Sequence, residues 1–125
     1  MTESGTQDLI GYSADFIEGK IEVRLTVEDK HLNRAETLHG GIMATLLDVA
    51  CGYEANLVPK PDKDTFMVTV SLTTNFIAAG KKGDDLLASA TTVGGGRSVK
   101  YVQGALCNQD GKVIATASGI FRKTG

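Results

Sequence analysis

Cysteine, histidine and proline are scarce in this chain of 125 residues, with two of each, and tryptophan is absent. The sequence has no Cys-X-X-Cys pair and no Cys/His cluster, which argues against a zinc site or a redox motif, so we expect no metal. Cys51 and Cys107 are most simply two buried, reduced thiols of a cytoplasmic protein. His31 lies in a polar stretch and is expected to be exposed.

Excess charge of one sign and long apolar runs are also missing. The formal net charge is −2, so nothing global attracts the protein to nucleic acid or to an anionic membrane. No apolar run approaches the ~20 residues that a membrane-spanning helix needs. The first residues lack the basic and apolar regions of a signal peptide. We therefore expect a cytoplasmic protein whose partners include neither nucleic acid nor membrane.

The composition that remains is that of an ordinary globular protein. Hydrophobic residues make up 42% of the chain and charged residues 22%, a balance that a disordered chain does not have. A chain of this size can bury a core without disulfides. We expect a single domain over residues 1–125, in which about residues 1–12 form an N-terminal segment that can be flexible.

Two kinds of hydrophobic periodicity divide the chain. Over residues 21–27 apolar and polar residues alternate, which predicts a half-buried strand. From Gly40 to about Leu57 apolar side chains cover most of the circumference of a helix, so this helix should be surrounded by protein. Pro59 and Pro61 end it, and a charged loop follows at 60–64.

Four strand-like runs follow the helix, at 66–78, 85–93, 98–108 and 113–121. The breaks between them have turn chemistry and are short enough for antiparallel hairpins, which predicts a meander of four strands. A flat sheet cannot enclose a helix that is apolar nearly all round, so the sheet must curl around it. The predicted fold is α+β, a curved antiparallel sheet wrapped around one long central helix, which is the hotdog architecture.

Gly40 and Gly41 begin the predicted helix, where each glycine is unfavourable by roughly 1 kcal/mol relative to alanine. Glycine allows a close approach of the backbone to a ligand. A helix N-terminus also offers unpaired N–H groups that can hold a developing oxyanion. From these residues alone, tight packing of the helix against a strand explains the two glycines equally well.

Asp48 is the one charge in the central part of this helix. Its neighbours are apolar, so it is either a structural carboxylate with a partner or a general base or nucleophile in a cleft. His39 precedes it by nine residues, which places the two about 180° apart around one helix and about 13 Å apart along it. If both are catalytic, each active site combines His39 and Gly40 of one subunit with Asp48 of another.

The spacing of these residues resembles that of a known family. Asn33, the run Leu38-His39-Gly40-Gly41 and Asp48 are similar to the phenylacetic-acid-degradation (PaaI-like) type of hotdog thioesterase and its mammalian mitochondrial relatives. The similarity continues along nearly the whole chain, at 68–70, 80–85 and 96–98. The resemblance implies hydrolysis of an acyl-CoA to free acid and CoA, with CoA as part of the substrate and no cofactor.

The resemblance also implies a role for each matching residue. The Gly40 backbone N–H would polarise the thioester carbonyl, and Asp48 of the facing subunit would activate water or attack directly. Asn33 and His39 would orient the carbonyl, the sulfur or the water, and the Thr69 hydroxyl would contact the nucleophilic water. Similar proteins are usually dimers of dimers, so we expect a homotetramer with active sites at its dimer interfaces.

The glycine-rich segment 94–98 lacks the spacing of a phosphate-binding P-loop and is not followed by a helix pattern. A hairpin turn or bulge is the simplest interpretation. In the similar proteins the residues after this turn line the channel for the CoA nucleotide. Gly96, Arg97 and Ser98 are therefore candidate CoA contacts, with the Arg97 guanidinium suited to a phosphate.

Two departures from the family pattern leave the acyl group open. Glu36 stands where similar proteins often have a glycine, and Ser71 and Thr73 stand where they tend to have polar or acidic residues that can touch the acyl group. Aromatic and fatty acyl groups both fit.

Two alternative functions also stay open. One is a non-catalytic acyl-CoA-binding hotdog protein. The other is a hotdog hydratase or dehydratase, although these enzymes usually have, after the histidine, a Pro-Gly that is missing here.

Overall fold

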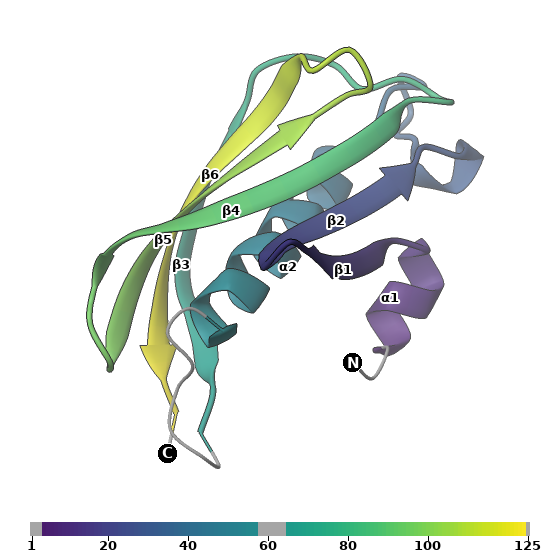
Figure 1. Ribbon diagram of the computed structural model, residues 1–125. Coiled ribbons are helices and arrows are strands. Elements are labelled where there is room, and N and C mark those ends of the chain that lie inside the picture. The colour runs from purple at the N-terminus through teal and green to yellow at the C-terminus, as the bar shows by residue number, and fades with distance from the viewer. Residues whose placement is uncertain (1–3, 58–64, 125) are drawn as a thin grey trace.

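The computed structural model describes residues 4–57 and 65–124 of the chain (Figure 1). The helices are α1 (Gly5–Ile10), the 3-10 helix η1 (Asp29–His31) and α2 (Gly40–Leu57). The strands are β1 (Ser13–Ile17), β2 (Lys20–Thr26), β3 (Met67–Phe76), β4 (Asp85–Gly95), β5 (Val99–Cys107) and β6 (Val113–Lys123). Pro59, Pro61 and the charged loop predicted at 60–64 lie outside the described residues.

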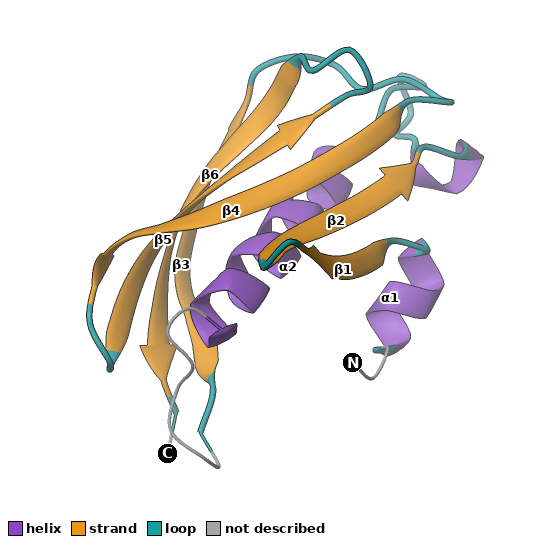
Figure 2. Ribbon diagram, viewed as in Figure 1, coloured by secondary structure: helices purple, strands orange, loops and turns teal. Residues whose placement is uncertain are grey.

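One six-stranded antiparallel sheet, with strand order β1-β2-β4-β5-β6-β3, curves around helix α2 (Figure 2). The predicted α+β hotdog fold is therefore confirmed. Over residues 4–57 and 65–124, no helix combines the length and hydrophobicity that crossing a membrane requires.

Helix α2 covers the concave face of the sheet and begins at the predicted glycine pair. Its buried side chains are Met43, Leu46, Leu47, Ala50, Cys51 and Ala55. Each fully buried leucine contributes about 1.5–3 kcal/mol to folding. The opposite side of the helix, which includes Thr45, Asp48 and Val49, is only half-buried in a single chain. The apolar pattern predicts burial on all sides of the helix, but in a single chain only the side that faces the sheet is fully buried.

The order of the strands corrects the predicted meander. Strands β4, β5 and β6 follow one another as hairpins, but β3 pairs with β6 at the far edge of the sheet rather than with β4. The residues between β3 and β4 cross the end of the sheet, where Gly80 O accepts a hydrogen bond from Leu38 N and Asp84 O accepts one from Val27 N. A Cβ on Gly80 would lie 2.7 Å from Leu38 Cδ2. The turn chemistry at 80–83 therefore belongs to a crossover packed against the start of α2.

Helix α1 was not predicted from the sequence. Ser4 Oγ accepts a hydrogen bond from Gln7 N at its start, and Gly11, with φ of 90°, ends it in the left-handed conformation. A serine N-cap and a glycine at the C-terminus are the usual signals that begin and end a helix.

His31 is buried, with 1% of its surface exposed, so the expectation of an exposed side chain was wrong. Its Nδ1 accepts a hydrogen bond from Glu28 N at 2.8 Å, and its Nε2 lies 2.7 Å from the Ile10 carbonyl, to which the ring N–H donates. The carbonyl of His31 accepts the backbone N–H of His39. The ring therefore connects the end of α1 to the loop that leads into α2.

The two cysteines differ in accessibility. Cys51 is fully buried, and burial, with smaller contributions from the charges of Asp48 and Glu54, raises the pKa of its thiol to about 12. Cys107 is only half-buried at the end of β5. The prediction of two buried thiols therefore holds for Cys51 and not for Cys107.

This difference predicts the thiol chemistry of the folded protein. Because the thiolate is the reactive form, we expect a colorimetric thiol reagent at neutral pH to label Cys107 in the native state and Cys51 only after unfolding. A Cys107→Ala variant should then show almost no labelling until denaturant is added. Rapid native labelling of that variant would contradict the assignment.

The loop before α2 contains a non-glycine residue in the left-handed conformation: Glu36 has a φ of 62°. A side chain in this conformation is less favourable by roughly 1–2 kcal/mol, because its Cβ crowds the following carbonyl. Glycine would not carry this strain.

We expect Glu36→Gly to raise the free energy of unfolding by about 0.5–1 kcal/mol, since relief of strain exceeds the entropy that glycine adds to the unfolded chain. The neighbouring exposed Ala35, whose φ is not positive, is the matched control, and Ala35→Gly should lower stability by a similar amount. Urea denaturation of the three proteins measures both changes. A loss of stability in both variants would show that Glu36 is not strained.

Candidate active site

The N-terminus of α2 leaves one backbone donor unpaired. A helix begins with four N–H groups that have no partner within the helix. Here Gly41 N donates to His39 Nδ1 at 2.9 Å, and the N–H groups of Ile42 and Met43 donate to the His39 carbonyl. The N–H of Gly40 makes no hydrogen bond with any residue of 4–57 or 65–124. This N–H is thus available at the positive end of the helix dipole.

Close packing explains the glycine at position 41 but not the one at position 40, where a Cβ would make an ordinary contact. A Cβ on Gly40 would lie 3.4 Å from the ring of Phe76 on β3, and one on Gly41 would lie 3.1 Å from Nδ1 of His39. A side chain at Gly41 would therefore press on the ring that caps the helix. Tight packing thus applies to Gly41, whereas Gly40 is the residue with the available donor.

Asn33 and His39 lie close together at the same end of α2. They line an open hollow of about 710 Å³ together with Leu32, Arg34 and Ala35. The Oδ1 of Asn33 accepts hydrogen bonds from the backbone N–H groups of Ala35 and Thr37 and from the Thr37 hydroxyl, so it organises the loop. Nδ2 of Asn33 has no partner among the described residues and can donate to a ligand. Because Nδ1 of His39 accepts a hydrogen bond, the proton of its neutral ring lies on Nε2.

Asp48 and Thr69 form the second group of predicted residues. Thr69 Oγ1, on β3, donates a hydrogen bond to Asp48 Oδ1 at 2.8 Å. Oδ2 of Asp48 makes no hydrogen bond within the described part of the chain. The carboxylate is thus held by one oxygen and presents the other, which is an arrangement suited to accepting a proton.

A pocket of about 480 Å³ lies beside Asp48, between α2 and β3. Its lining is largely apolar and aromatic, with Tyr12, Tyr53, Phe66 and Phe121 among its side chains. Burial, followed by the neighbouring Tyr12, raises the pKa of the Tyr53 phenol. Sequence reasoning missed Tyr12 and Phe66, because no local pattern places the N-terminal segment and the start of β3 beside the same part of α2.

Within one chain these groups do not meet. Asn33, His39 and Gly40 lie at the N-terminal end of α2, and Asp48 lies near its middle (Figure 1). The turn with Gly96, Arg97 and Ser98 is exposed and lies toward the other end of the helix, where Lys100 Nζ donates to the Ala55 carbonyl at 2.6 Å. Gly96 N donates to the Val99 carbonyl, so the segment is a hairpin turn, as predicted.

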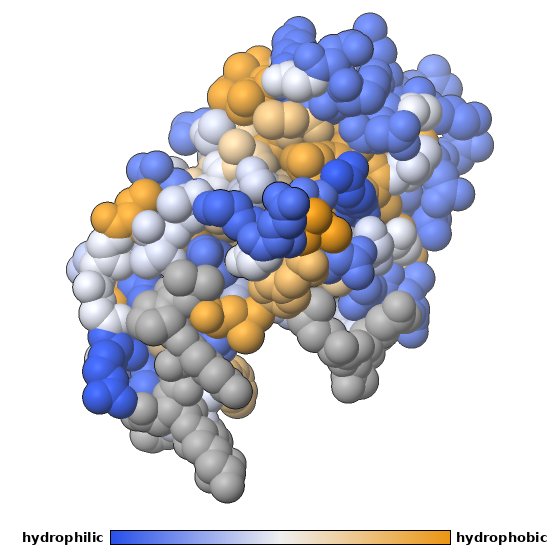
Figure 3. All heavy atoms as spheres, viewed as in Figure 1, coloured by the Kyte–Doolittle hydropathy of each residue, from blue (hydrophilic) through white to orange (hydrophobic). Residues whose placement is uncertain are grey.

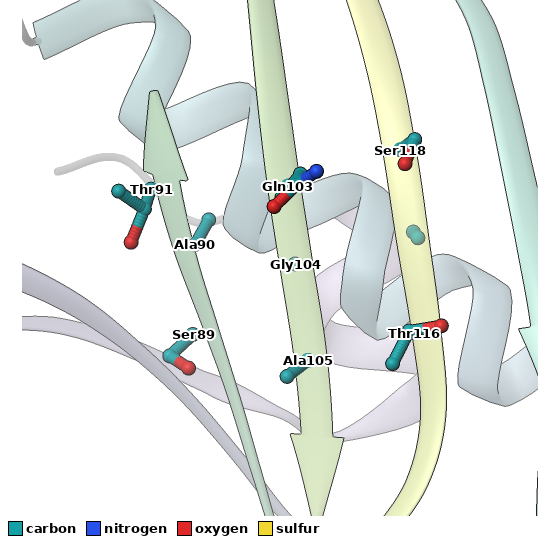
Figure 4. A pocket seen from close by; sticks show the side chains of 9 residues that line it. Ser89, Ala90, Thr91, Gln103, Gly104, Ala105, Thr116 and Ser118 are labelled. Atoms are coloured by element: carbon teal, nitrogen blue, oxygen red, sulfur yellow. The ribbon is translucent and has the colours of Figure 1, made fainter. Parts of the chain in front are cut away.

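A further hollow, of about 420 Å³, lies on the sheet across β4, β5 and β6, away from the predicted site residues (Figure 4). Its exposed side chains, Ser89, Thr91, Gln103 and Ser118, are small or neutral. In the described parts of the chain, no three histidine, cysteine or acidic side chains come together as metal ligands would.

Comparison with known proteins identifies the family. The model of the thioesterase superfamily matches residues 35–115. A Pseudomonas aeruginosa protein named "Putative esterase" is 30% identical over 116 residues, which are 91% of this chain and 84% of that protein. Acyl-coenzyme A thioesterase PaaI of Escherichia coli is 29% identical over 108 residues, 86% of this chain and 74% of that one.

Solved structures agree with these relatives. A Bacillus halodurans protein with CoA has a TM-score of 0.87 and 28% identity, over 98% of this chain and 78% of that chain. A Streptococcus mutans protein bound to acetyl-CoA has a TM-score of 0.79 and 30% identity, over 91% of this chain and 89% of that chain. The chain therefore belongs to the thioesterase superfamily and is a PaaI-like thioester hydrolase with the hotdog fold.

Proposed function

We propose that the protein hydrolyses an acyl-CoA to the free acid and CoA at sites shared between two chains. The observation that carries the proposal is the set of hydrogen bonds made by the backbone N–H groups at the start of α2. The N–H groups of Gly41, Ile42 and Met43 are paired there, and within residues 4–57 and 65–124 that of Gly40 has no partner and is left to hold a carbonyl oxygen. The acyl group, aromatic or fatty, would enter the aromatic pocket beside Asp48.

In the proposed reaction the thioester carbonyl oxygen accepts the Gly40 N–H. As the tetrahedral intermediate forms, this oxygen becomes negative and is stabilised by the donor and by the helix dipole. Asn33 and His39 line the same hollow, and their Nδ2 and Nε2 groups would orient the carbonyl or the sulfur. Collapse of the intermediate breaks the C–S bond, and CoA leaves as a thiolate that is then protonated.

Asp48 is the proposed general base or nucleophile of the reaction. With Oδ1 held by Thr69, Oδ2 would take a proton from water as that water attacks the carbonyl carbon. Alternatively Oδ2 attacks the carbonyl carbon itself, and water then hydrolyses the resulting anhydride. Both routes require the carboxylate of Asp48 to face the Gly40 N–H across the substrate.

Helix geometry is the reason for two chains. His39 directly precedes α2, and continued helical periodicity would place it about 180° from Asp48, so we infer that a second copy supplies the missing half. The outer edge of β3 is open, and Phe66, Val70, Phe76 and Ile77 are each more than half exposed there. Patches of apolar surface are visible on the single chain (Figure 3). A second copy would cover this edge and the open side of α2, and two such dimers would form the tetramer.

The turn at 96–98 is the proposed contact for the CoA nucleotide. It is exposed, and the planar guanidinium of Arg97 can form paired hydrogen bonds with a phosphate. The Bacillus halodurans and Streptococcus mutans structures contain CoA and acetyl-CoA, which supports this class of substrate for a chain of the same fold.

We expect Asp48→Asn to lower kcat by roughly 10²–10⁴-fold, because the amide cannot accept the proton. Release of CoA from a panel of acyl-CoAs, followed with a thiol reagent, measures the change. The matched control is Asp15→Asn, an exposed carboxylate on β1, which should leave kcat unchanged. Unchanged turnover in folded, oligomeric Asp48→Asn would contradict the proposed role, and CoA binding by wild type without any thiol release would instead indicate a non-catalytic binding protein.

Hybrid dimers test whether the sites are shared. Asn33→Ala and Asp48→Asn chains should each be nearly inactive alone, since each removes one half of every site. A hybrid of the two, purified through two different affinity tags, should regain one of its two sites and about half of the wild-type kcat per dimer. A purified hybrid as inactive as its parents would show that each site lies within one chain.

A further inference from the structure

Asn56 lies in the last part of α2, on the side that faces β3. It follows Asp48 by eight residues, which places the two about 80° apart around the helix. Both side chains line the pocket of about 480 Å³ between α2 and β3. The sequence analysis did not single out Asn56, because its partners come from a strand beyond the helix.

The side-chain amide of Asn56 pairs with both main-chain groups of one residue on β3. Its Oδ1 accepts a hydrogen bond from Met67 N at 2.7 Å, and its Nδ2 donates to Met67 O at 3.2 Å. Nδ2 also donates to the Gly52 carbonyl, one turn earlier in α2, at 2.8 Å. The amide therefore takes the place that a neighbouring strand would occupy at Met67.

Met67 needs this partner because β3 is an edge strand. The preceding residue, Phe66, has its carbonyl directed toward the β6 side, where Thr124 N donates to it. Successive residues of a strand direct their N–H and C=O groups to opposite sides, so those of Met67 point to the open edge. Met67 is only 4% exposed, and buried backbone groups without a partner are unfavourable.

The same stretch of β3 carries Thr69, whose hydroxyl donates to Asp48. The pairing of β3 with β6 is irregular between Thr69 and Ser71, where the register shifts by one residue. Met67 and Thr69 lie together in the regular stretch before this shift, paired with Lys123 and Phe121, so a displacement of Met67 would be passed on to Thr69. In the described part of the chain, side-chain hydrogen bonds join β3 to the half-buried side of α2 at this point, between Asn56 and Met67 and between Asp48 and Thr69.

We propose that Asn56 is a positioning residue for the thioesterase reaction: by holding Met67, it places the Thr69 hydroxyl against Oδ1 of Asp48 and so aims Oδ2 at the substrate. The proposal rests on the role proposed above for Asp48. Asn56 touches neither the reacting atoms nor the attacking water and acts on them through Thr69. A displacement of about 1 Å in such a group can lower turnover by as much as 10²-fold.

A double-mutant cycle with Thr69 tests the proposal in the full-length oligomer. Asn56→Leu removes all three hydrogen bonds at similar volume, and Asn56→Asp keeps the acceptor for Met67 N but loses the donor for Met67 O and Gly52 O. We expect each to lower kcat by roughly tenfold with KM changed less than about threefold, the pattern of a group that acts in the transition state. Thr69→Val should lower kcat by a similar factor, and adding either Asn56 change to it should have little further effect.

Gln103→Glu is the matched amide-to-acid control for Asn56→Asp, because Gln103 is exposed on β5 and is not part of the proposed site. If folded Asn56 variants keep the wild-type kcat, or if they lower it by the same factor with and without Thr69, the proposal is overturned. Should Asn56→Leu fail to fold, Asn56→Asp decides. Asp48→Asn, assayed in parallel, separates the two failures: full activity there would overturn the proposed function, whereas its inactivity together with normal Asn56 variants would overturn only this inference.

Discussion

The packing of α2 into the concave face of the sheet is the interaction on which the other features depend. The buried leucines at 46 and 47 and the small residues at 50, 51 and 55 allow the helix to lie close against the strands. This contact fixes the orientation of the helix on the sheet and determines which side of the helix stays partly exposed. The N-terminus then lies beside the Asn33 loop, and Asp48 lies on the open side, facing β3.

The crossover between β3 and β4 has consequences for the site. By sending β3 to the far edge of the sheet, it gives α2 a strand with unpaired main-chain groups as a neighbour. The helix uses this strand in two ways, since Asn56 pairs with the backbone of Met67 and Asp48 accepts the hydroxyl of Thr69. The rest of the edge remains open, which is why the chain by itself carries exposed apolar side chains there. An open edge of this kind is usually covered by another chain.

Different polar and charged groups lie at the two ends of α2. At the start of the helix the Gly40 N–H has no partner among the residues that the structure describes, and the first turn has no acidic residue. Toward the end, Lys100 donates to the Ala55 carbonyl, as is favourable for a cation near a helix C-terminus. Burial lowers the pKa of Lys100, and the nearby Glu54 opposes that shift, whereas burial raises the pKa of Glu54 itself. The charges of Lys100 and Glu54, near the last turns of α2, thus partly offset the effect of burial on each other's pKa.

The sequence by itself determined the features that depend on local periodicity and spacing. The alternation at 21–27 and the helix from Gly40 to Leu57 both follow from the repeat of a strand or a helix, which needs no distant partner. Only the tertiary structure decided the edge position of β3, the burial of His31 and the contact between Asn56 and Met67. Each of these features depends on which distant segment packs beside the residue or strand and forms hydrogen bonds with it. Such pairings are settled by packing of the whole chain, because the local sequence around His31 or Asn56 does not specify which distant segment will supply the partner.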